Sequence, residues 1–303
     1  MSINSVNTNN GAMIALQSLN RTNSDLAATE KRISTGFRVA DSTDDGAAYA
    51  VAQSVRSTIG ALTTANQQLG NVQGLLSTTQ SGLNDVSKTM ASMRDVLVTL
   101  TNSNVQGDTR QQYISQYKSL LANVKTYLND ASYGGKTLIG NITGTAGAAW
   151  NAAVGFCRVA VVRNENGVSY GIATFGAQAV YNALNFGNID VHSATGAGVT
   201  AAFGVTTMQV VAKGTAAASF ITQQNLVGGG LNTIGSEINY VSNQIGYNSD
   251  KIDALNSGLG SLVDADLAKE SAQLQALQIR QQLGTQALSL ANQAPQTLLS
   301  LFK

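Results

Sequence analysis

Residues 51–100 read VAQSVRSTIGALTTANQQLGNVQGLLSTTQSGLNDVSKTMASMRDVLVTL, with apolar side chains recurring at alternating spacings of three and four. Only Thr58 and Thr79 are polar members of this series. Such spacing places a narrow apolar seam on a long helix, and a narrow seam needs a partner helix to cover it. The helix would be roughly 75 Å long, which favours a rod over a compact globule. The seam runs through Val51, Val55, Thr58, Leu62, Ala65, Leu69, Val72, Leu76, Thr79, Leu83, Val86, Met90, Met93, Leu97 and Leu100.

A second seam of the same type lies between residues 231 and 262, where only Asn248 breaks the apolar series. A shorter third seam covers residues 113–127. We therefore expect the two halves of the chain to pair as long helices. The residues expected to form this rod seam are Leu69, Val72, Leu76, Leu83, Val86, Ile238, Val241, Ile245, Ile252 and Leu255.

Both ends of the chain carry weaker seams. A helix is expected over about residues 5–35, with Gly36 placed to end it. Near residue 262 the apolar phase slips by one residue beside Gly258 and Gly260, which predicts a joint between two helical segments. Because these ends are too thinly apolar to bury themselves alone, we expect them to be poorly ordered in the free monomer and to order on assembly. The expected filament-core seam comprises Leu19, Leu26, Ile33, Leu267, Leu274, Leu277 and Leu288.

The middle of the chain has a different character, because glycine and alanine are dense between about residues 140 and 214. Residues 156–163 and 168–175 predict strands, and the intervening sequence Asn-Glu-Asn-Gly predicts a hairpin turn. A further strand is expected over 206–213, and the three glycines at 228–230 are expected to interrupt the helix that follows. The predicted fold is mainly α: a nested coiled-coil rod built from both chain ends, with a small β-rich central insertion.

Composition restricts the classes of function. Charged residues make up 12% of the chain, about half the usual ~25%, and the net charge is +1, so nothing indicates a nucleic-acid partner. Extensive self-contact and a soluble protein with a plain polar surface fit this composition equally. The single Cys157 excludes an internal disulfide framework, and the chain has one proline. No signal-peptide core or membrane-spanning stretch is found, so export would not rely on a cleavable signal.

Residues that could support catalysis are scarce. His192 is the only histidine and lies in a Gly/Ala/Ser/Thr segment, while Cys157 lies in a predicted strand as a small apolar residue. Asp41, Asp44 and Asp45 lack the spacing of a calcium loop and suit a linker and helix cap. We therefore expect no enzyme activity, no cofactor and no metal site.

Motifs at both ends of the chain resemble those of bacterial flagellin, the subunit of the flagellar filament. The resemblance covers roughly residues 1–140 and 216–303. It rests on residues 2–19, RISTGFRV at 32–39, the aspartates at 44–45, DADLAKES at 264–271, QALQI at 275–279, ANQAPQ at 291–296 and LLSLFK at 298–303.

This resemblance implies an extracellular helical homopolymer that serves motility after unfolded type III export. Segments 1–42 and 264–303 would line the filament core as coiled coils. Segments 43–140 and 216–263 would form the surrounding shell, and 141–215 would be a surface-exposed variable insertion. The implied partners are other copies of the chain, a flagellar export chaperone, and the hook-junction and cap proteins.

The resemblance also aligns residues 90–95 with the segment that a flagellin-sensing innate immune receptor recognises in this family. The segment includes Met90 and Met93. Arg94 and Asp95 keep the family's charge types, whereas Ser92 stands where a second arginine is common. Because serine cannot replace a bidentate cation, we expect weak receptor activation.

Two other functions remain open. A hook–filament junction adaptor has similar termini but would not form long filaments. Alternatively, the insertion could be a surface module that binds a glycan or a host receptor through stacking aromatic side chains. The aromatic residues available for that role are Trp150, Tyr170, Phe175, Tyr181 and Phe186, which equally suit a small core.

Overall fold

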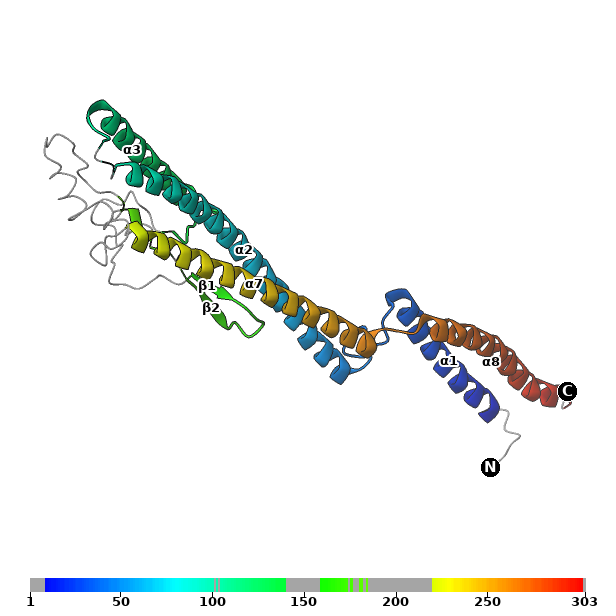
Figure 1. The fold of residues 1–303 in the computed structure, drawn as a ribbon. Coiled ribbons are helices and arrows are strands. Elements are labelled where there is room, and N and C mark those ends of the chain that lie inside the picture. The colour runs from blue at the N-terminus through cyan, green and yellow to red at the C-terminus, as the bar shows by residue number, and fades with distance from the viewer. Residues whose placement is uncertain are drawn as a thin grey trace. The chain divides into compact units, whose positions relative to one another are not determined.

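A computed structural model describes residues 9–100, 102, 104–139, 159–173, 175–176, 180–181, 184 and 220–301, with side chains to residue 293. Five helices dominate these residues and confirm the mainly α prediction (Figure 1). The elements are α1 (Asn10–Thr35), α2 (Gly46–Leu100), α3 (Gly107–Asp130), β1 (Val159–Val162), β2 (Ser169–Ile172), α7 (Phe220–Val263) and α8 (Leu267–Leu301).

The chain divides into two compact units, which we describe separately. The terminal unit comprises residues 1–60 and 252–303, and the central unit comprises residues 61–251. The boundaries between these units fall inside α2 and α7.

Helix α1 has a cap at each end. The Asn9 side chain accepts a hydrogen bond from the Ala12 backbone N–H at 3.1 Å, which satisfies one free donor of the first turn. Gly36 ends the helix with φ of 75°, and its N–H donates to the Arg32 carbonyl at 2.8 Å. The predicted glycine cap is confirmed, because this left-handed conformation favours a residue without Cβ. The expected helical residues before Asn9 lie outside the described residues.

A short backbone joint connects the segment after α1 with the end of α7. The Arg38 N–H donates to the Val263 carbonyl at 2.7 Å, and the Ala265 N–H donates to the Gly36 carbonyl at 2.9 Å. The Arg38 guanidinium also donates to the Leu262 carbonyl at 2.6 Å. The predicted phase slip thus coincides with a break between α7 and α8, and this break lies beside the Gly36 end of α1.

The start of α2 differs from the expected seam. Val51 is 55% exposed, whereas Ala48 and Ala52 are buried with Val39 and Val263. The buried side of this first part of α2 is therefore formed by small side chains that lie beside the joint. Asp45 caps the helix, because its Oδ1 accepts hydrogen bonds from the N–H groups of residues 47 and 48 at 3.1 and 3.0 Å.

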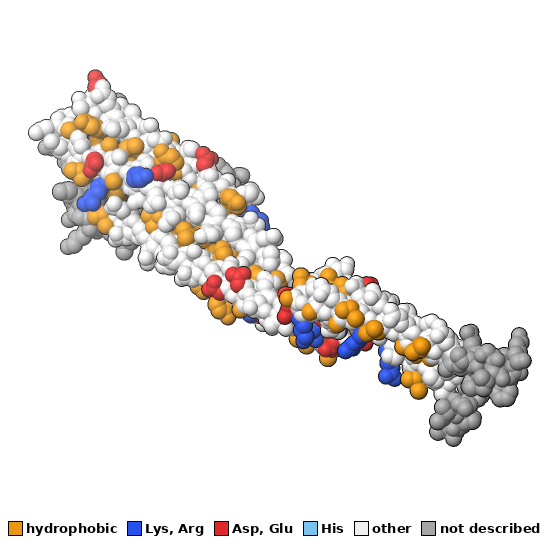
Figure 2. Space-filling model, turned by 90° about the vertical axis from the view of Figure 1, so that its right-hand side faces the viewer, with side chains coloured by type: hydrophobic (Ala, Val, Ile, Leu, Met, Phe, Trp, Pro, Cys, Tyr) orange, Lys and Arg blue, Asp and Glu red, His pale blue; other side chains and the backbone are white. Residues whose placement is uncertain are grey.

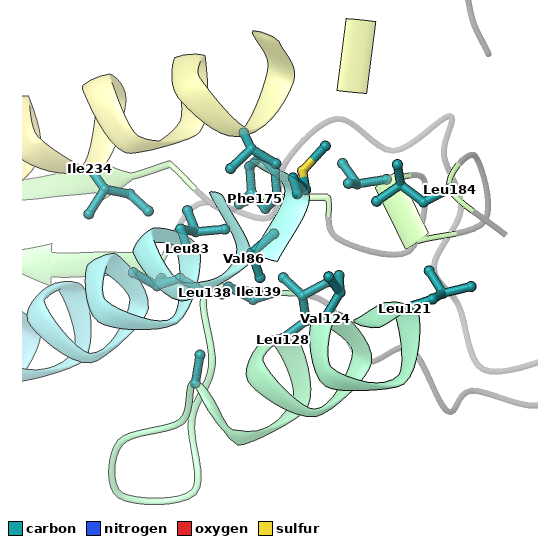
Figure 3. Close-up of a cluster of buried hydrophobic side chains, with 14 of the residues drawn as sticks. Leu83, Val86, Leu121, Val124, Leu128, Leu138, Ile139, Phe175, Leu184 and Ile234 are labelled. Carbon is teal, nitrogen blue, oxygen red and sulfur yellow. The ribbon is translucent and has the colours of Figure 1, made fainter. Parts of the chain in front are cut away.

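The core of the central unit lies between α2, α3, α7 and the β1–β2 hairpin. Side chains from the three helices converge with Phe175 and residues 138 and 139 (Figure 3). β1 and β2 pair antiparallel, with Val159 opposite Ile172 and Val162 opposite Ser169. The predicted hairpin is confirmed, with β1 ending one residue earlier than expected and β2 beginning one residue later. Residues 156–158 and 174 of the expected strands lie outside the described residues. The strand expected at 206–213 lies outside the described residues.

The expected break at glycines 228–230 is wrong, because α7 runs through all three. Gly230 has a packing role instead. A Cβ at this position would lie 2.7 Å from the Phe175 ring, so only glycine lets that ring rest on the helix backbone. The same logic holds at Gly82, where a Cβ would lie 2.7 Å from Ala131 beside α3.

No described helix is long and apolar enough to cross a membrane. Within the same residues, no group of three or more histidine, cysteine or acidic side chains is placed to hold a metal ion.

Candidate assembly surface

The terminal unit brings the two ends of the chain together as an antiparallel pair of helices, α1 and α8 (Figure 1). The Asn9 amide donates to the Ala291 carbonyl at 2.8 Å near one end of the pair. In the middle, the Gln281 amide donates to Asn23 Oδ1 at 2.8 Å. These pairs join low residue numbers in α1 to high numbers in α8, which defines the antiparallel direction.

Both helices present a complete heptad pattern to each other, but many of its members are small or polar. A Cβ on Gly284 would lie 3.3 Å from Leu19 Cδ1, so the helices approach closely there. Small residues permit this approach but bury little apolar area. The less exposed side of α1 consists of Ala12, Ala15, Leu19, Thr22, Leu26, Thr29 and Ile33, and that of α8 of Glu270, Leu274, Leu277, Gln281, Gly284, Leu288 and Ala291.

Glu270 places a carboxylate in this seam. The residue is 7% exposed, and its Oε1 lies 3.4 Å from the Arg32 guanidinium. Its second oxygen, Oε2, is buried without a hydrogen-bond donor within the described residues. A buried carboxylate is costly unless it is paired, so the α1–α8 contact depends on Arg32.

The structure places six of the seven expected core-seam residues between α1 and α8. Leu277 is buried, and five others are half-buried. The seventh, Leu267, is 50% exposed at the start of α8. The five half-buried residues are Leu19, Leu26, Ile33, Leu274 and Leu288.

A second set of apolar side chains, absent from the sequence-based seam, points away from this pair. Figure 2 shows hydrophobic side chains on the exposed surface of the terminal helices. On α1, part of this set borders a shallow, open hollow lined by Met13, Leu16, Gln17, Asn20, Arg21 and Ser24. In the sequence, this outward-facing set could have been found as further apolar residues on the terminal helices that do not belong to the heptad seam. Its members are Met13 (64% exposed), Ile14 (69%), Leu16 (48%), Ile279 (58%), Leu283 (58%) and Leu290 (70%).

As a set, the expected rod-seam residues are more deeply buried than the core-seam residues, and most of them lie in the central unit. Most of them belong to its continuous core, while Ile238 and Ile245 are partly buried against that core. Ile252 and Leu255 fall in the terminal unit and are half-buried. The core members are Leu69, Val72, Leu76, Leu83, Val86 and Val241.

Residues 90–95, which align with the receptor-binding region, lie on two opposite sides of α2. Met90 and Met93 are fully buried in the core of the central unit. Ser92, Arg94 and Asp95 are exposed on the other side of the helix. A partner approaching this surface would therefore meet the serine and the two charges and not the methionines.

The aromatic residues of the insertion that the structure describes are engaged in packing. Tyr170 stacks on Tyr240 with ring centroids 4.1 Å apart. Phe175 is buried, and Tyr181 packs partly buried against the same core. Trp150 and Phe186 lie outside the described residues, as do His192 and Cys157.

A cluster of charged side chains ties α1 to the linker before α2. Lys31 Nζ lies 2.7 Å from Asp41 Oδ2 and 2.9 Å from Asp44 Oδ1. These hydrogen bonds lower the pKa of both aspartates, with Thr43 also donating to Asp41, and they raise the pKa of Lys31. The cluster therefore positions the linker between α1 and α2.

Comparisons with known proteins agree across the full length of the chain. Residues 6–143 match the family model of the bacterial flagellin N-terminal helical region, and residues 215–302 match that of the C-terminal helical region. The chain is 30% identical to Flagellin FljK of Caulobacter vibrioides over 305 residues, which is 100% of each protein. It is also 30% identical to a flagellin of Brucella melitensis over 299 residues, which is 99% of each.

A solved structure shares the fold. It is that of a putative flagellar hook-associated protein from Vibrio parahaemolyticus, with a TM-score of 0.57 and 17% sequence identity. The match covers 73% of this chain and 100% of that one.

Proposed function

Because this chain belongs to the bacterial flagellin family, and is thus a structural subunit of the extracellular flagellar filament, we propose that copies polymerise through α1 and α8. The observation that carries the proposal is the apolar set on the outer side of this helix pair. Large side chains such as Ile14 and Leu290 remain more than two-thirds exposed in a single chain. Covering them with other copies removes apolar area from water at each contact.

A seeded polymerisation assay tests this proposal. Ile279→Ser with Leu283→Ser removes two exposed apolar side chains from α8 without touching its seam with α1. At ~1.5 kcal/mol or more for each buried side chain, the lost burial totals about 3 kcal/mol, so the critical concentration should rise about a hundredfold.

Two exposed glutamines on the same helix supply the matched control. Gln278→Ser with Gln282→Ser removes side chains of similar length that are polar, and it should polymerise close to the parent chain. Equal critical concentrations for the two double variants would refute the proposed role of α8. Circular dichroism of each free variant confirms that the central unit remains folded.

The regions then take different positions in the filament. Segments 1–42 and 264–303 line the core, 43–140 and 216–263 form the shell, and 141–215 faces the medium. Unfolded type III export suits a chain with one cysteine and one proline, because neither a disulfide nor several slow prolyl bonds would delay folding. An export chaperone and the hook-junction and cap proteins complete the proposed partners.

Catalysis has no place in this proposal. Flagellins are a structural family, and we infer that this chain is not an enzyme. We also propose that the exposed Ser92 limits the contact that residues 90–95 can make with the innate receptor.

The shared fold with a hook-associated protein supports a second candidate, a junction adaptor. Full-length similarity to flagellins favours the filament subunit over this role. Electron microscopy after seeding separates the two functions. A filament subunit extends seeds into long filaments, whereas an adaptor adds a short layer and stops.

A further inference from the structure

Asn248 is the one polar member of the apolar series on α7, and it is completely buried in the central unit. Its Nδ2 donates to Asn66 Oδ1 on α2 at 2.9 Å and to the Arg163 carbonyl beside β1 at 3.0 Å. Its Oδ1 accepts from the Gln244 amide at 3.0 Å. One side chain therefore connects α2, α7 and the β1–β2 hairpin.

The hairpin makes further contacts along the same side of α7. The Arg163 guanidinium donates to the Tyr240 hydroxyl at 3.2 Å, and Tyr170 stacks on the Tyr240 ring. One turn beyond Asn248, Lys251 forms an ion pair with Glu165 in the hairpin turn. These contacts hold the Arg163 carbonyl in the position where Asn248 needs an acceptor.

The apolar seams alone do not define how far α2 and α7 have slid along each other. The helices are antiparallel, because Asn66 lies beside Asn248 while Leu83 lies beside Gly230. Both seams repeat every seven residues, so a slide of one heptad, about 10.5 Å, again brings apolar side chains together. A second feature must distinguish one register from the next.

A buried asparagine supplies that distinction because its hydrogen bond to α2 exists in one register. A one-heptad slide would put Ile59 or Gln73 in the place of Asn66. Isoleucine has no acceptor, and the longer glutamine side chain would carry its amide away from the position of the Asn66 oxygen. We propose that Asn248 is a positioning residue that fixes the axial register of α2 against α7 through its bond to Asn66.

The test measures distances between spin labels in the free chain, so its outcome does not depend on filament assembly. Labels at Lys88→Cys and Ser242→Cys, with Cys157→Ser, lie on exposed positions of α2 and α7 several turns apart along the axis. A slide of one heptad then changes the distance by up to about 10.5 Å. Asn248→Leu should replace one narrow distance peak with at least two, while the helical content stays unchanged.

Two further variants complete the experiment. Asn232→Leu changes an exposed asparagine on the same helix and should keep the single narrow peak. Asn66→Ala removes the acceptor on α2, together with the bond that the Asn66 amide donates to Ser249 Oγ at 3.3 Å, and should broaden the peak in the same direction by a smaller amount. If Asn248→Leu does not fold, Asn66→Ala decides the question. A narrow, unshifted peak in Asn248→Leu, or in Asn66→Ala when the first variant is unfolded, would overturn the proposal.

Discussion

Arg32 and Glu270 form a charged contact between the two terminal helices, with 3.4 Å between the guanidinium and the carboxylate. The glutamate is nearly buried, whereas the arginine side chain is 35% exposed. Arg32→Met would leave a buried carboxylate without its cation, and we expect the α1–α8 pair to lose about 1–3 kcal/mol. The measurement is the rate of amide hydrogen exchange in α8 of the assembled polymer, which should increase.

The double variant Arg32→Met/Glu270→Leu provides the control for that measurement. Replacing both charges by apolar groups removes the unpaired carboxylate, so exchange should return close to the rate of the parent chain. Similar rates in Arg32→Met and in the parent would show that the contact contributes nothing to pairing.

Two adjacent glycines in α7 should respond to alanine in opposite directions. At Gly229 a Cβ meets no atom within 4 Å, so Gly229→Ala should stabilise the helix by about 0.5–1 kcal/mol through helix propensity. At Gly230 the Cβ would lie 2.7 Å from the Phe175 ring, so Gly230→Ala should cost about 1–3 kcal/mol through overpacking. Thermal unfolding of both variants measures the difference, and equal shifts of Tm would contradict the packing role of Gly230.

The contact of Lys31 with Asp41 and Asp44 should depend on pH at both extremes. The lowered pKa of the two carboxyl groups gives a stabilisation that is present above their ordinary pKa near 3.9 and is lost as the pH falls. The raised pKa of Lys31 gives a second stabilisation, which is present below about pH 10.4. This stabilisation is lost as the pH rises through the pKa that Lys31 has in the folded protein. The linker should therefore be fixed between about pH 4 and pH 10.

Carboxyl chemical shifts of residues 41 and 44, followed by NMR during acid titration, check this dependence. In Lys31→Met both groups should titrate closer to the ordinary pKa of an aspartate. Unchanged titration curves in that variant would exclude Lys31 as the cause.

The sequence predicted the parts of the fold that repeat. The heptad spacing located the long helices, and the hairpin turn and the Gly36 cap followed from residues with strong local conformational preferences. The heptad pattern also selected Leu277 and five of its half-buried neighbours, because a seam is a local property of each helix.

The features that the sequence did not predict depend on contacts between distant residues. Glycines 228–230 look like a break until Phe175 is known to lie on Gly230. Val51 fits the seam by spacing, but the joint brings Val39 and Val263 to the side of α2 that carries Ala48 and Ala52. The outward set that includes Ile14 and Leu290 was missed because periodicity identifies a seam and does not say which further stripe stays uncovered.

Ser92 offers a direct test of receptor recognition. It is exposed on α2 next to the charged residues 94 and 95, so Ser92→Arg can add a cation without disturbing the core. We expect a stronger signal in a receptor reporter assay, because arginine binds carboxylates through two parallel hydrogen bonds. Ser92→Ala should stay as weak as the parent, and an unchanged signal from the arginine variant would show that another residue limits recognition.

Helical content should increase when the free chain polymerises. Among the described residues of α1 and α8, only Thr29, Glu270 and Leu277 are buried, and two of these are polar. A pair of helices that covers so little apolar area is marginal in water, whereas the central unit has a continuous core. We therefore expect α1 (26 residues) and α8 (35 residues) to be largely unfolded in dilute monomer and helical in the polymer.

Circular dichroism of the same sample before and after seeding measures this change. Loss of both helices affects about a fifth of the 303 residues, which is well within the sensitivity of the method. Limited proteolysis of the monomer should remove both ends and leave the central unit intact, because an ordered helix is a poor protease substrate. Protease-resistant ends and no gain in helix would mean that α1 and α8 are already stable as a pair, and that assembly joins preformed surfaces.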